Sequence, residues 1–293
     1  MQARLALWAI LMLALNAPAH AEPDWAAVGK ALGKSGAQVS NELYRVGLPR
    51  SDLKVTLDGV QLKPALALGS WLAFRAMGDR DAMVMGDLVL TEREVNPVMS
   101  KLIEGGIGVT ALHNHLLRSE PVTMYMHVTA HGDPVKLATA LHAALQVSGT
   151  PLLDSPPAIS SAIDLDTAAI DQELGHRGKV NGGVYQVSIP RAETIKDGGM
   201  DVPEAMGSAI AINFQPTGNG KVAITGDFVL IASEVNPVLR ALRENGIEVT
   251  AVHNHMLDDA PRLFFMHFWA NDDVQKLAKG LRAVLNQVKV AKT

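Results

Sequence analysis

The sequence contains no cysteine. A chain without cysteine can form no disulfide, offers no thiolate to a metal ion and has no cysteine to carry a lipid. Any metal site must therefore do without thiolate ligands, and the 293 residues must be stabilised by their own apolar core. A chain of this length suggests two domains of ordinary size.

Long apolar runs are also scarce, and the prominent one lies at the N-terminus. Arg4 precedes an apolar run over Leu5–Leu15, and the small residues Ala19 and Ala21 close the segment. This pattern predicts a secretory signal peptide over residues 1–21. The alternative is a membrane anchor, but the run is shorter than the roughly 18–20 residues that span a bilayer. We therefore expect a periplasmic or secreted protein with no membrane span.

An excess of basic residues is missing as well. The chain has 26 lysines and arginines against 30 acidic residues, a formal net charge of −4. This mild acidity argues against nucleic acid as a partner. The sequence also lacks a nucleophile elbow, a phosphate-binding glycine-rich loop, a dinucleotide fingerprint and a His-Glu-x-x-His helix.

An internal repeat is the strongest feature that is present. Gly86–Leu145 aligns with Gly226–Leu285 without a gap, and 31 of the 60 aligned positions carry the same residue. A repeat of this size indicates a duplicated domain. The predicted organisation is a signal peptide at 1–21, a first repeat domain at 22–149, a proline-rich linker at 150–160 and a second repeat domain at 161–293.

The pattern within one copy predicts an α+β fold. In the second copy we expect strands at 223–230, 247–256 and 262–270, a helix from 233 to about 245, and a last helix from 272 to 285. Further strands are expected at 184–189 and 208–214, and Gly218-Asn219-Gly220 is typical of a hairpin turn. The order β-α-β-β-α resembles a split β-α-β core. Each domain should be a mainly antiparallel sheet with helices on one face.

Six of the ten histidines form two equivalent triplets. They are His113, His115 and His127 in the first copy and His253, His255 and His267 in the second. Residues two apart in a strand share a face, so His113 and His115 should project together. If the hairpin turns at Pro121, His127 lies directly opposite His115 and three imidazoles converge. A slip of one residue would turn His127 to the other face.

The residues that alternate with the histidines are apolar. They are Met124, Met126 and Val128 in the first copy and Phe264, Met266 and Phe268 in the second. We expect this face to pack on the helices, which leaves the histidine face for solvent, a cleft or other strands. The twelve methionines of the chain suggest copper as the metal, but we expect these side chains to serve packing.

Three imidazoles on a rigid hairpin can bind a divalent transition metal and leave a coordination position open. Zinc is favoured and copper is the alternative. Glu94 and Glu234 lie at the start of the helix that precedes each histidine strand. Each is a candidate fourth ligand or general base. Their alternative role is to stabilise the helix dipole from the first turn. The triplets themselves have two other interpretations, a polar groove for an organic ligand and a purely structural cluster.

Two further repeated pairs have simpler interpretations. Arg50 and Arg191 follow prolines, and each is expected to be a solvated charge at a strand end rather than a binding group for an anionic substrate. Asp87 and Asp227 follow glycines, a pairing that predicts a turn or a bulge.

At these motifs the chain resembles the LppY/LpqO family, exported bacterial proteins with a domain of unknown function. The matching segments are Gly-Asp-Phe-Val-Leu at 226–230, Glu-Val-Asn-Pro-Val at 234–238, the stretch ending His-Asn-His at 246–255, and Met-His-Phe-Trp at 266–269. The resemblance implies export to the cell envelope and no particular activity. The lipid-bearing cysteine of the namesakes is absent, so membrane anchoring is not implied.

The leading functional prediction is a periplasmic protein with two His-x-His…His metal sites, in its enzyme version a metal-dependent hydrolase of envelope material. A metal-bound water would then be the nucleophile and Glu94 or Glu234 the base. The alternative is a non-catalytic module that binds a cell-wall glycan, peptide or small organic ligand between histidines and Tyr125, Phe265 or Trp269. A third is an assembly protein whose histidine face packs on a partner. The sequence leaves open whether the two copies pack on each other as a homodimer would.

Overall fold

A computed structural model describes residues 23–78, 80–152 and 162–291. The predicted signal peptide and most of the predicted linker lie outside these residues.

The first half forms a six-stranded antiparallel sheet in the order β1-β2-β5-β6-β8-β7. Its elements are α1 (Trp25–Leu32), β1 (Ala37–Ser40), β2 (Leu43–Pro49), β3 (Thr56–Leu57), β4 (Val60–Gln61), α2 (Pro64–Ala67), β5 (Gly69–Met77), β6 (Asp81–Thr91), α3 (Glu92–Glu104), β7 (Gly108–His113), β8 (Thr123–Gly132) and α4 (Pro134–Leu145).

The second half repeats this plan with the sheet order β9-β10-β13-β14-β17-β15. Its elements are α5 (Thr167–Leu174), β9 (Gly178–Asn181), β10 (Val184–Ile189), β11 (Lys196–Asp197), β12 (Met200–Asp201), the 3-10 helix η1 (Glu204–Met206), β13 (Ile210–Gly218), β14 (Lys221–Ile231), α6 (Ala232–Glu244), β15 (Glu248–His253), β16 (Asp259–Ala260), β17 (Leu263–Asp273) and α7 (Val274–Leu285). The predicted α+β class is confirmed.

Local sequence explains where these elements begin and end. Asp133 caps α4, because its carboxylate accepts hydrogen bonds from the Val135 and Lys136 amides. Gly246 ends α6 with a φ of 71°, a left-handed conformation that suits glycine. The predicted hairpin joins β13 and β14, with Gly218 paired to Lys221. The predicted strand over 247–256 is shorter in the structure, because β15 stops at His253.

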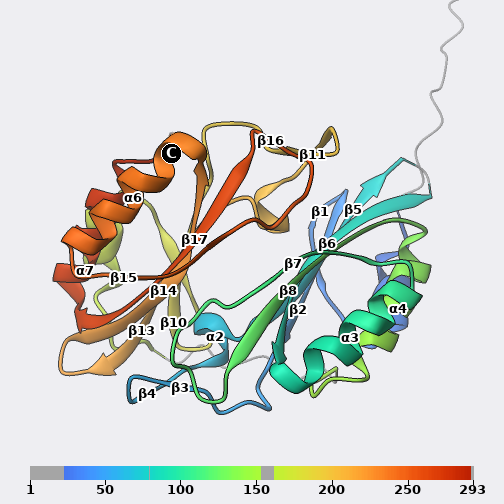
Figure 1. Ribbon diagram of the computed structural model, residues 1–293, viewed down its shortest axis with the longest axis horizontal. Coiled ribbons are helices and arrows are strands. Elements are labelled where there is room, and N and C mark those ends of the chain that lie inside the picture. Colours follow the sequence, from blue (N-terminus) through green and yellow to red (C-terminus); the bar gives the residue numbers. More distant parts are fainter. Residues whose placement is uncertain (1–22, 79, 153–161, 292–293) are drawn as a thin grey trace, which may run out of the picture.

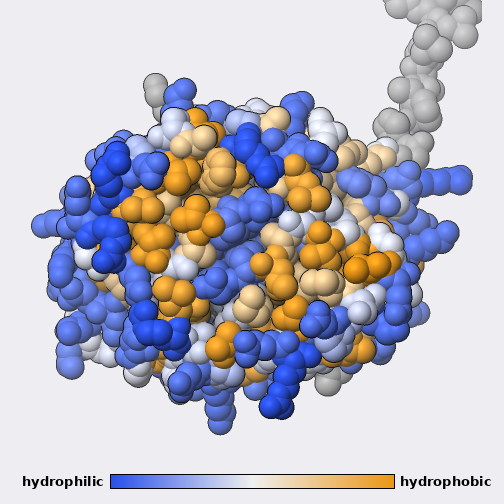
Figure 2. Space-filling view, in the orientation of Figure 1, coloured by the Kyte–Doolittle hydropathy of each residue, from blue (hydrophilic) through white to orange (hydrophobic). Residues whose placement is uncertain are grey.

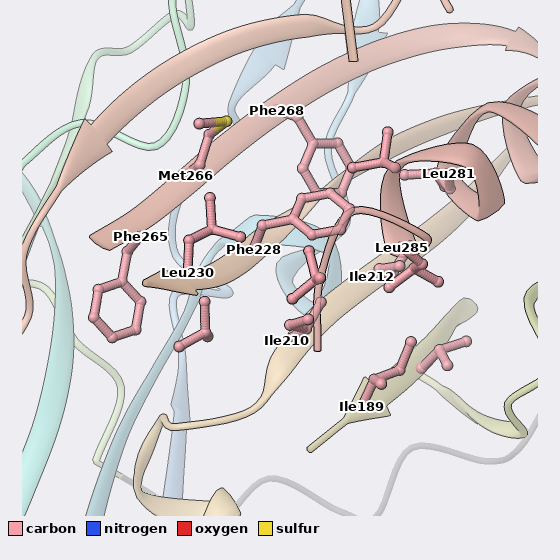
Figure 3. Packing of buried hydrophobic residues seen from close by; sticks show 14 of the residues in the cluster. Ile189, Ile210, Ile212, Phe228, Leu230, Phe265, Met266, Phe268, Leu281 and Leu285 are labelled. Carbon is pink, nitrogen blue, oxygen red and sulfur yellow. The ribbon is translucent and has the colours of Figure 1, made fainter. Parts of the chain in front are cut away.

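The helices cover the outer face of each sheet. Figure 1 shows α3 and α4 at one end of the molecule and α6 and α7 at the other, with the two sheets between them. Phe228 and Phe268 lie 5.3 Å apart between ring centroids, against Leu281 and Leu285 of α7 (Figure 3). Met126, Val128, Met266 and Phe268 are buried in these helix-facing cores, as predicted, whereas Met124 and Phe264 are only half-buried.

The inner faces of the two sheets meet each other. A third apolar cluster joins Leu57, Leu66 and Tyr125 of the first half to Ala223 and Trp269 of the second. Figure 2 shows the outside of this junction, a hydrophilic strip with apolar side chains gathered on both sides. The two copies therefore pack on each other in the manner of a homodimer.

Each half also extends a segment over the sheet of the other. The Lys63 amide, between β4 and α2, donates to Gln215 Oε1 on β13 at 2.8 Å. In the opposite direction, Arg45 on β2 donates to the Ala205 carbonyl of η1 at 2.8 Å. These exchanged segments interlock the halves and fix how the inner faces align. No helix among the described residues has the length and apolar character needed to cross a bilayer.

Candidate metal centre

The six histidines of the two triplets all lie at the junction of the halves. His113 ends β7, His115 lies two residues beyond it, and His127 lies on β8. The second copy repeats this, and its histidines are His253, His255 and His267 on β15, the following loop and β17. The strands thus direct both triplets from the inner faces of the two sheets.

The predicted pairing of each histidine hairpin is wrong in register but right in face. His127 pairs with Ala111 rather than with His115, and His113 pairs with Tyr125. The register also shifts between Val109 and Ala111, where β7 carries a bulge. Because the partner is displaced by four residues, an even number, His127 still faces the same side as His113.

Two groups of potential metal ligands result. Within each group, one ligand atom per residue lies within 4.8 Å of the others. The groups are His113, His115 and His127, and His113, His253, His255 and His267. The convergence of each triplet follows the prediction, whereas their merging into one cluster was not predicted.

Imidazoles from opposite halves stack in pairs across the junction. Ring centroids lie 3.5 Å apart for His113 and His253, 3.7 Å for His115 and His267, and 3.6 Å for His127 and His255. The pairing is symmetric, because exchanging the halves exchanges the last two pairs. His113 and His253 therefore lie on the pseudo-twofold axis.

Backbone carbonyls fix the orientation of three of the rings. Nδ1 of His113 lies 3.2 Å from the Asn114 carbonyl oxygen, and Nδ1 of His253 lies 3.1 Å from that of Asn254. Nδ1 of His267 lies 2.8 Å from the Gly226 carbonyl oxygen. A carbonyl only accepts, so these Nδ1 atoms carry the proton and Nε2 presents a lone pair. Metal-binding histidines in proteins are commonly held in this way.

The Nε2 atoms of all six histidines are buried, and within the described part of the chain none has a hydrogen-bond partner. Burial, and next the neighbouring His253, lower the pKa of His113 to about 3. Burial lowers the pKa of His253 to about 4. The pKa values of the other four are lowered well below 6.5, first by burial and then by nearby histidines. All six rings are thus neutral at pH 7, the state that binds metals.

Two aspartates that the sequence assigned to a turn or a bulge belong to this cluster, and that prediction is wrong, because both lie in continuously paired strands. Asp87 and Asp227 lie in the middle of β6 and β14, where they pair with His127 and His267. Asp87 Oδ2 lies 3.8 Å from His115 Nε2, and its equivalent Asp227 Oδ2 lies 3.6 Å from His255 Nε2. Retention of Gly-Asp in both copies was the signal that could have found them.

The glycines that precede these aspartates allow neighbouring strands to approach closely, and they do not form turns. A Cβ on Gly86 would lie 2.7 Å from the Trp71 carbonyl oxygen, and one on Gly226 would lie 1.9 Å from that of Ala211. Only glycine permits these approaches, which bring each aspartate to its position.

Burial raises the pKa of Asp87 to about 8, against the opposing charge of Arg45. Burial, followed by the charge of Asp87, raises the pKa of Asp227 well above its usual range. The two carboxyl groups therefore tend to be protonated unless a cation lies beside them.

The asparagines and threonines of both copies bind the halves together around the histidines. Thr110 Oγ1 donates to the His255 carbonyl at 2.5 Å, and Thr250 Oγ1 donates to the His115 carbonyl at the same distance. Asn114 Nδ2 donates to the Thr250 carbonyl at 3.3 Å. The middle residue of each His-Asn-His motif therefore serves the junction.

Glu94 and Glu234 lie in a different environment from the histidines. Glu94 accepts hydrogen bonds from the Arg50 guanidinium at 2.8 and 3.1 Å and from the Thr91 and Gly149 amides. Glu234 accepts equivalent bonds from Arg191. Neither glutamate belongs to the groups of potential ligands among the described residues. Their oxygens serve the start of α3 and α6.

Arg50 and Arg191 are buried, with 1% and 5% of their surface exposed, which corrects their expected place at a solvated strand end. Each also donates to a backbone carbonyl, that of Val89 on β6 or Val229 on β14, at 2.6 Å. Both guanidinium groups are committed to these internal partners.

Of the aromatic residues considered for ligand binding, two stack on histidines of the cluster and the third hydrogen-bonds across the junction. Tyr125 stacks on His115 with centroids 3.4 Å apart, and Phe265 stacks on His255 at 3.5 Å. Trp269 Nε1 donates to Asp58 Oδ2 across the junction at 3.1 Å.

A family model described as Domain of Unknown Function (DUF1259) matches residues 26–147 and 168–287. The chain belongs to this family. It carries two DUF1259 domains, and each contributes one histidine triplet. No curated protein matches the chain. Among solved structures, the trimeric bacterial microcompartment shell protein PduB is similar over 87% of this chain and 89% of its own, at 10% identity and a TM-score of 0.21. A likeness at that level carries no functional information.

The donor set at the junction of the DUF1259 domains fits a transition metal. Neutral imidazoles with free Nε2 atoms are good ligands for zinc, copper, nickel and iron, and a nearby carboxylate can complete the shell. A bound cation would also supply the partner that the buried Nε2 atoms and the Oδ1 atoms of Asp87 and Asp227 require.

Proposed function

We propose that this protein is an exported metal-binding protein whose two DUF1259 domains jointly bind transition-metal ions in one histidine centre. The observation that carries the proposal is the set of six buried Nε2 atoms, unpartnered within the described residues. Burying a polar atom without a partner costs about 1–3 kcal/mol. Six such atoms in one place are explained by a cation that binds them.

A purely structural histidine cluster is less well supported. Structural histidines satisfy both ring nitrogens with protein groups, as buried polar atoms generally do. Here Nδ1 of His113, His253 and His267 has such a partner, and the other nitrogen does not. This division of roles is typical of ligands.

A site for a glycan or peptide is also less well supported. The cavity beside His127 and His255 has a volume of about 10 Å³, room for about one water molecule or ion. This cavity, between stacked imidazoles and aromatic rings, is too small for a sugar. The small cavity supports binding of an ion, and Glu94 and Glu234 hydrogen-bond to Arg50 and Arg191.

Export and the finer family assignment belong to the same proposal. The apolar segment before Ala21 supports export, and the periplasm is the compartment we infer. The His-Asn-His and Glu-Val-Asn-Pro-Val motifs of both copies support placing these DUF1259 domains with LppY/LpqO proteins. Zinc and copper are the metals that the donor set suits best.

The test is the metal content of protein purified without a histidine tag and loaded in turn with Zn(II) and copper. We expect bound metal in the wild type and its loss in the double variant His113→Gln and His253→Gln, because these residues lie on the axis of the cluster. His131→Gln is the matched control, since His131 is an exposed histidine of β8 outside the cluster. Unchanged metal content in the double variant would refute the proposal.

A further inference from the structure

The two ends of the histidine centre differ in chemistry. At the end where His127 and His255 stack, three methionines line the cavity of about 10 Å³ together with both imidazoles. They are Met85, Met206 and Met256, with 6%, 2% and 2% of their surface exposed. Both halves contribute, because Met85 belongs to β6 and the other two to the second half.

The chain positions of these methionines tie them to the histidine centre. Met85 precedes Asp87 by two residues on β6, so both lie on the inner face of the sheet. Met256 directly follows His255, and Met206 ends η1, which packs on β5. The methionine end is therefore part of the centre rather than of a separate core.

The opposite end, where His115 and His267 stack, lacks these methionines. The offset of 140 residues that relates the copies places Leu116 opposite Met256 and Thr225 opposite Met85. Aligning Gly69-Ser70 with Gly207-Ser208 places Leu68 opposite Met206. Leucine thus fills two equivalent positions, with Leu68 and Leu116 only 0% and 4% exposed. Packing alone does not require methionine there.

Thioether sulfur is a soft ligand that selects copper(I), whereas zinc is bound through imidazole, carboxylate or thiolate. This chain has no cysteine, so methionine is its available soft donor. Building on the proposed metal-binding function, we propose that the methionine end is a copper(I) site formed by His127, His255 and thioethers of Met85, Met206 and Met256. The leucine end then has only nitrogen and oxygen donors and does not share this preference.

The experiment compares copper(I) and Zn(II) binding to the full chain under anaerobic conditions, with a chromophoric chelator as competitor. The variant is the triple substitution Met85→Leu, Met206→Leu and Met256→Leu, which conserves volume and costs little stability. The matched control is Met126→Leu with Met266→Leu, two fully buried methionines on the helix-facing side of the strands that carry His127 and His267. Circular dichroism checks that both variants are folded.

We expect copper(I) affinity to fall by about tenfold or more in the triple variant, since even outer-shell changes at metal sites cost about 10–100-fold. Zn(II) affinity should be unchanged, and the control should match the wild type. X-ray absorption of the copper(I) protein should show copper–sulfur scattering that the triple variant loses. If the triple variant fails to fold, the single variant Met256→Leu, with the same two measurements, replaces it.

Equal copper(I) affinity in the variant and the wild type, with no copper–sulfur scattering, would overturn the copper(I) proposal alone. Zn(II) binding that persists in that case would keep the histidine centre as a metal site. Failure of both metals to bind the wild type would instead refute the proposed function on which this inference rests.

Discussion

Single buried polar residues in this protein are satisfied in two different ways. Arg50 and Arg191 are each bonded by the chain itself, through two carboxylates and a backbone carbonyl. His113, His253 and His267 have Nδ1 bonded to a backbone carbonyl and Nε2 without a partner among the described residues. The difference separates residues that stabilise the fold from the histidines that we propose as metal ligands.

Glu234→Gln should therefore lower stability without affecting metal content. The substitution removes the buried counter-charge of the Arg191 guanidinium, which is 0% exposed at its side chain, and leaves the more exposed Glu193 as its charged partner. Removing one partner of a buried pair costs about 3–5 kcal/mol, which urea unfolding can measure. Glu104→Gln is the control, because the exposed pair with Lys101 is worth less than about 1 kcal/mol. Loss of metal at unchanged stability would instead make Glu234 a ligand.

Residue types allowed the histidines to be identified from the sequence, whereas the roles of the aspartates required the structure. Three histidines at strand spacing, present in both copies, identify the position of the site although they leave its ligand open. Asp87 follows a glycine, the commonest sign of a turn, and only the pairing of β6 with β8 brings it to His127. The same holds for Arg50, which meets Glu94 of α3 and the Val89 carbonyl of β6 only in the folded chain.

At the scale of the element, the histidine hairpin combines a regular strand with an irregular one. β8 is paired along its whole length with β6, whereas β7 carries a bulge and ends at His113. His115 thus lies in a loop, where Thr250 of the other half binds its carbonyl. The sequence predicts which side chains of the strand share a face, but it does not predict which residues pair. The register depends on the length of the turn, and a shift by an even number of residues leaves the faces unchanged.

The double variant Thr110→Val and Thr250→Val should weaken the junction and the metal site together. Each change leaves the carbonyl of His255 or His115 without its donor, at a cost of about 1–3 kcal/mol. Metal affinity should fall about tenfold, because these carbonyls position the two loop histidines. Urea unfolding and metal titration measure the two effects. Thr139→Val, on the exposed face of α4, is the control; an equal effect there would contradict this role.

At the scale of the whole molecule, the fold of one copy was accessible from its sequence and the contact between copies was not. Periodicity identifies which face of each strand packs on the helices. Both inner faces also carry large apolar residues, such as Val89 and Phe265, and nothing in the pattern indicates that they cover each other. Exchange of segments near Lys63 and Ala205 depends on contacts far apart in the chain.

The centre as a whole predicts that the metal-free protein is sensitive to acid. Histidines whose pKa is lowered on folding, such as His113 to about 3 and His253 to about 4, stabilise the fold fully above pH 6.5. That stability is lost as pH falls, because the unfolded chain takes up protons that the folded chain does not. Asp87, with its pKa raised to about 8, acts in the opposite direction and stabilises the fold as pH falls.

Because six imidazoles outweigh two carboxyl groups, the melting temperature of the metal-free protein should fall between pH 6.5 and pH 4.5. The slope should be steeper in the double variant Asp87→Asn and Asp227→Asn, which lacks the opposing carboxyl groups. Thermal unfolding followed by circular dichroism measures both. A melting temperature that stays constant over this range would contradict the assignment of neutral, buried imidazoles.

The leucine and methionine ends have a consequence for how such a centre can change over generations. In a dimer of two identical chains, every mutation occurs in both subunits. Both ends of a shared centre therefore carry the same residues. A gene that encodes both copies is free of that constraint, and Met256 can arise while Leu116 is kept. Fusion of the two copies thus allows the two ends of the histidine centre to differ, which a pair of identical subunits cannot achieve.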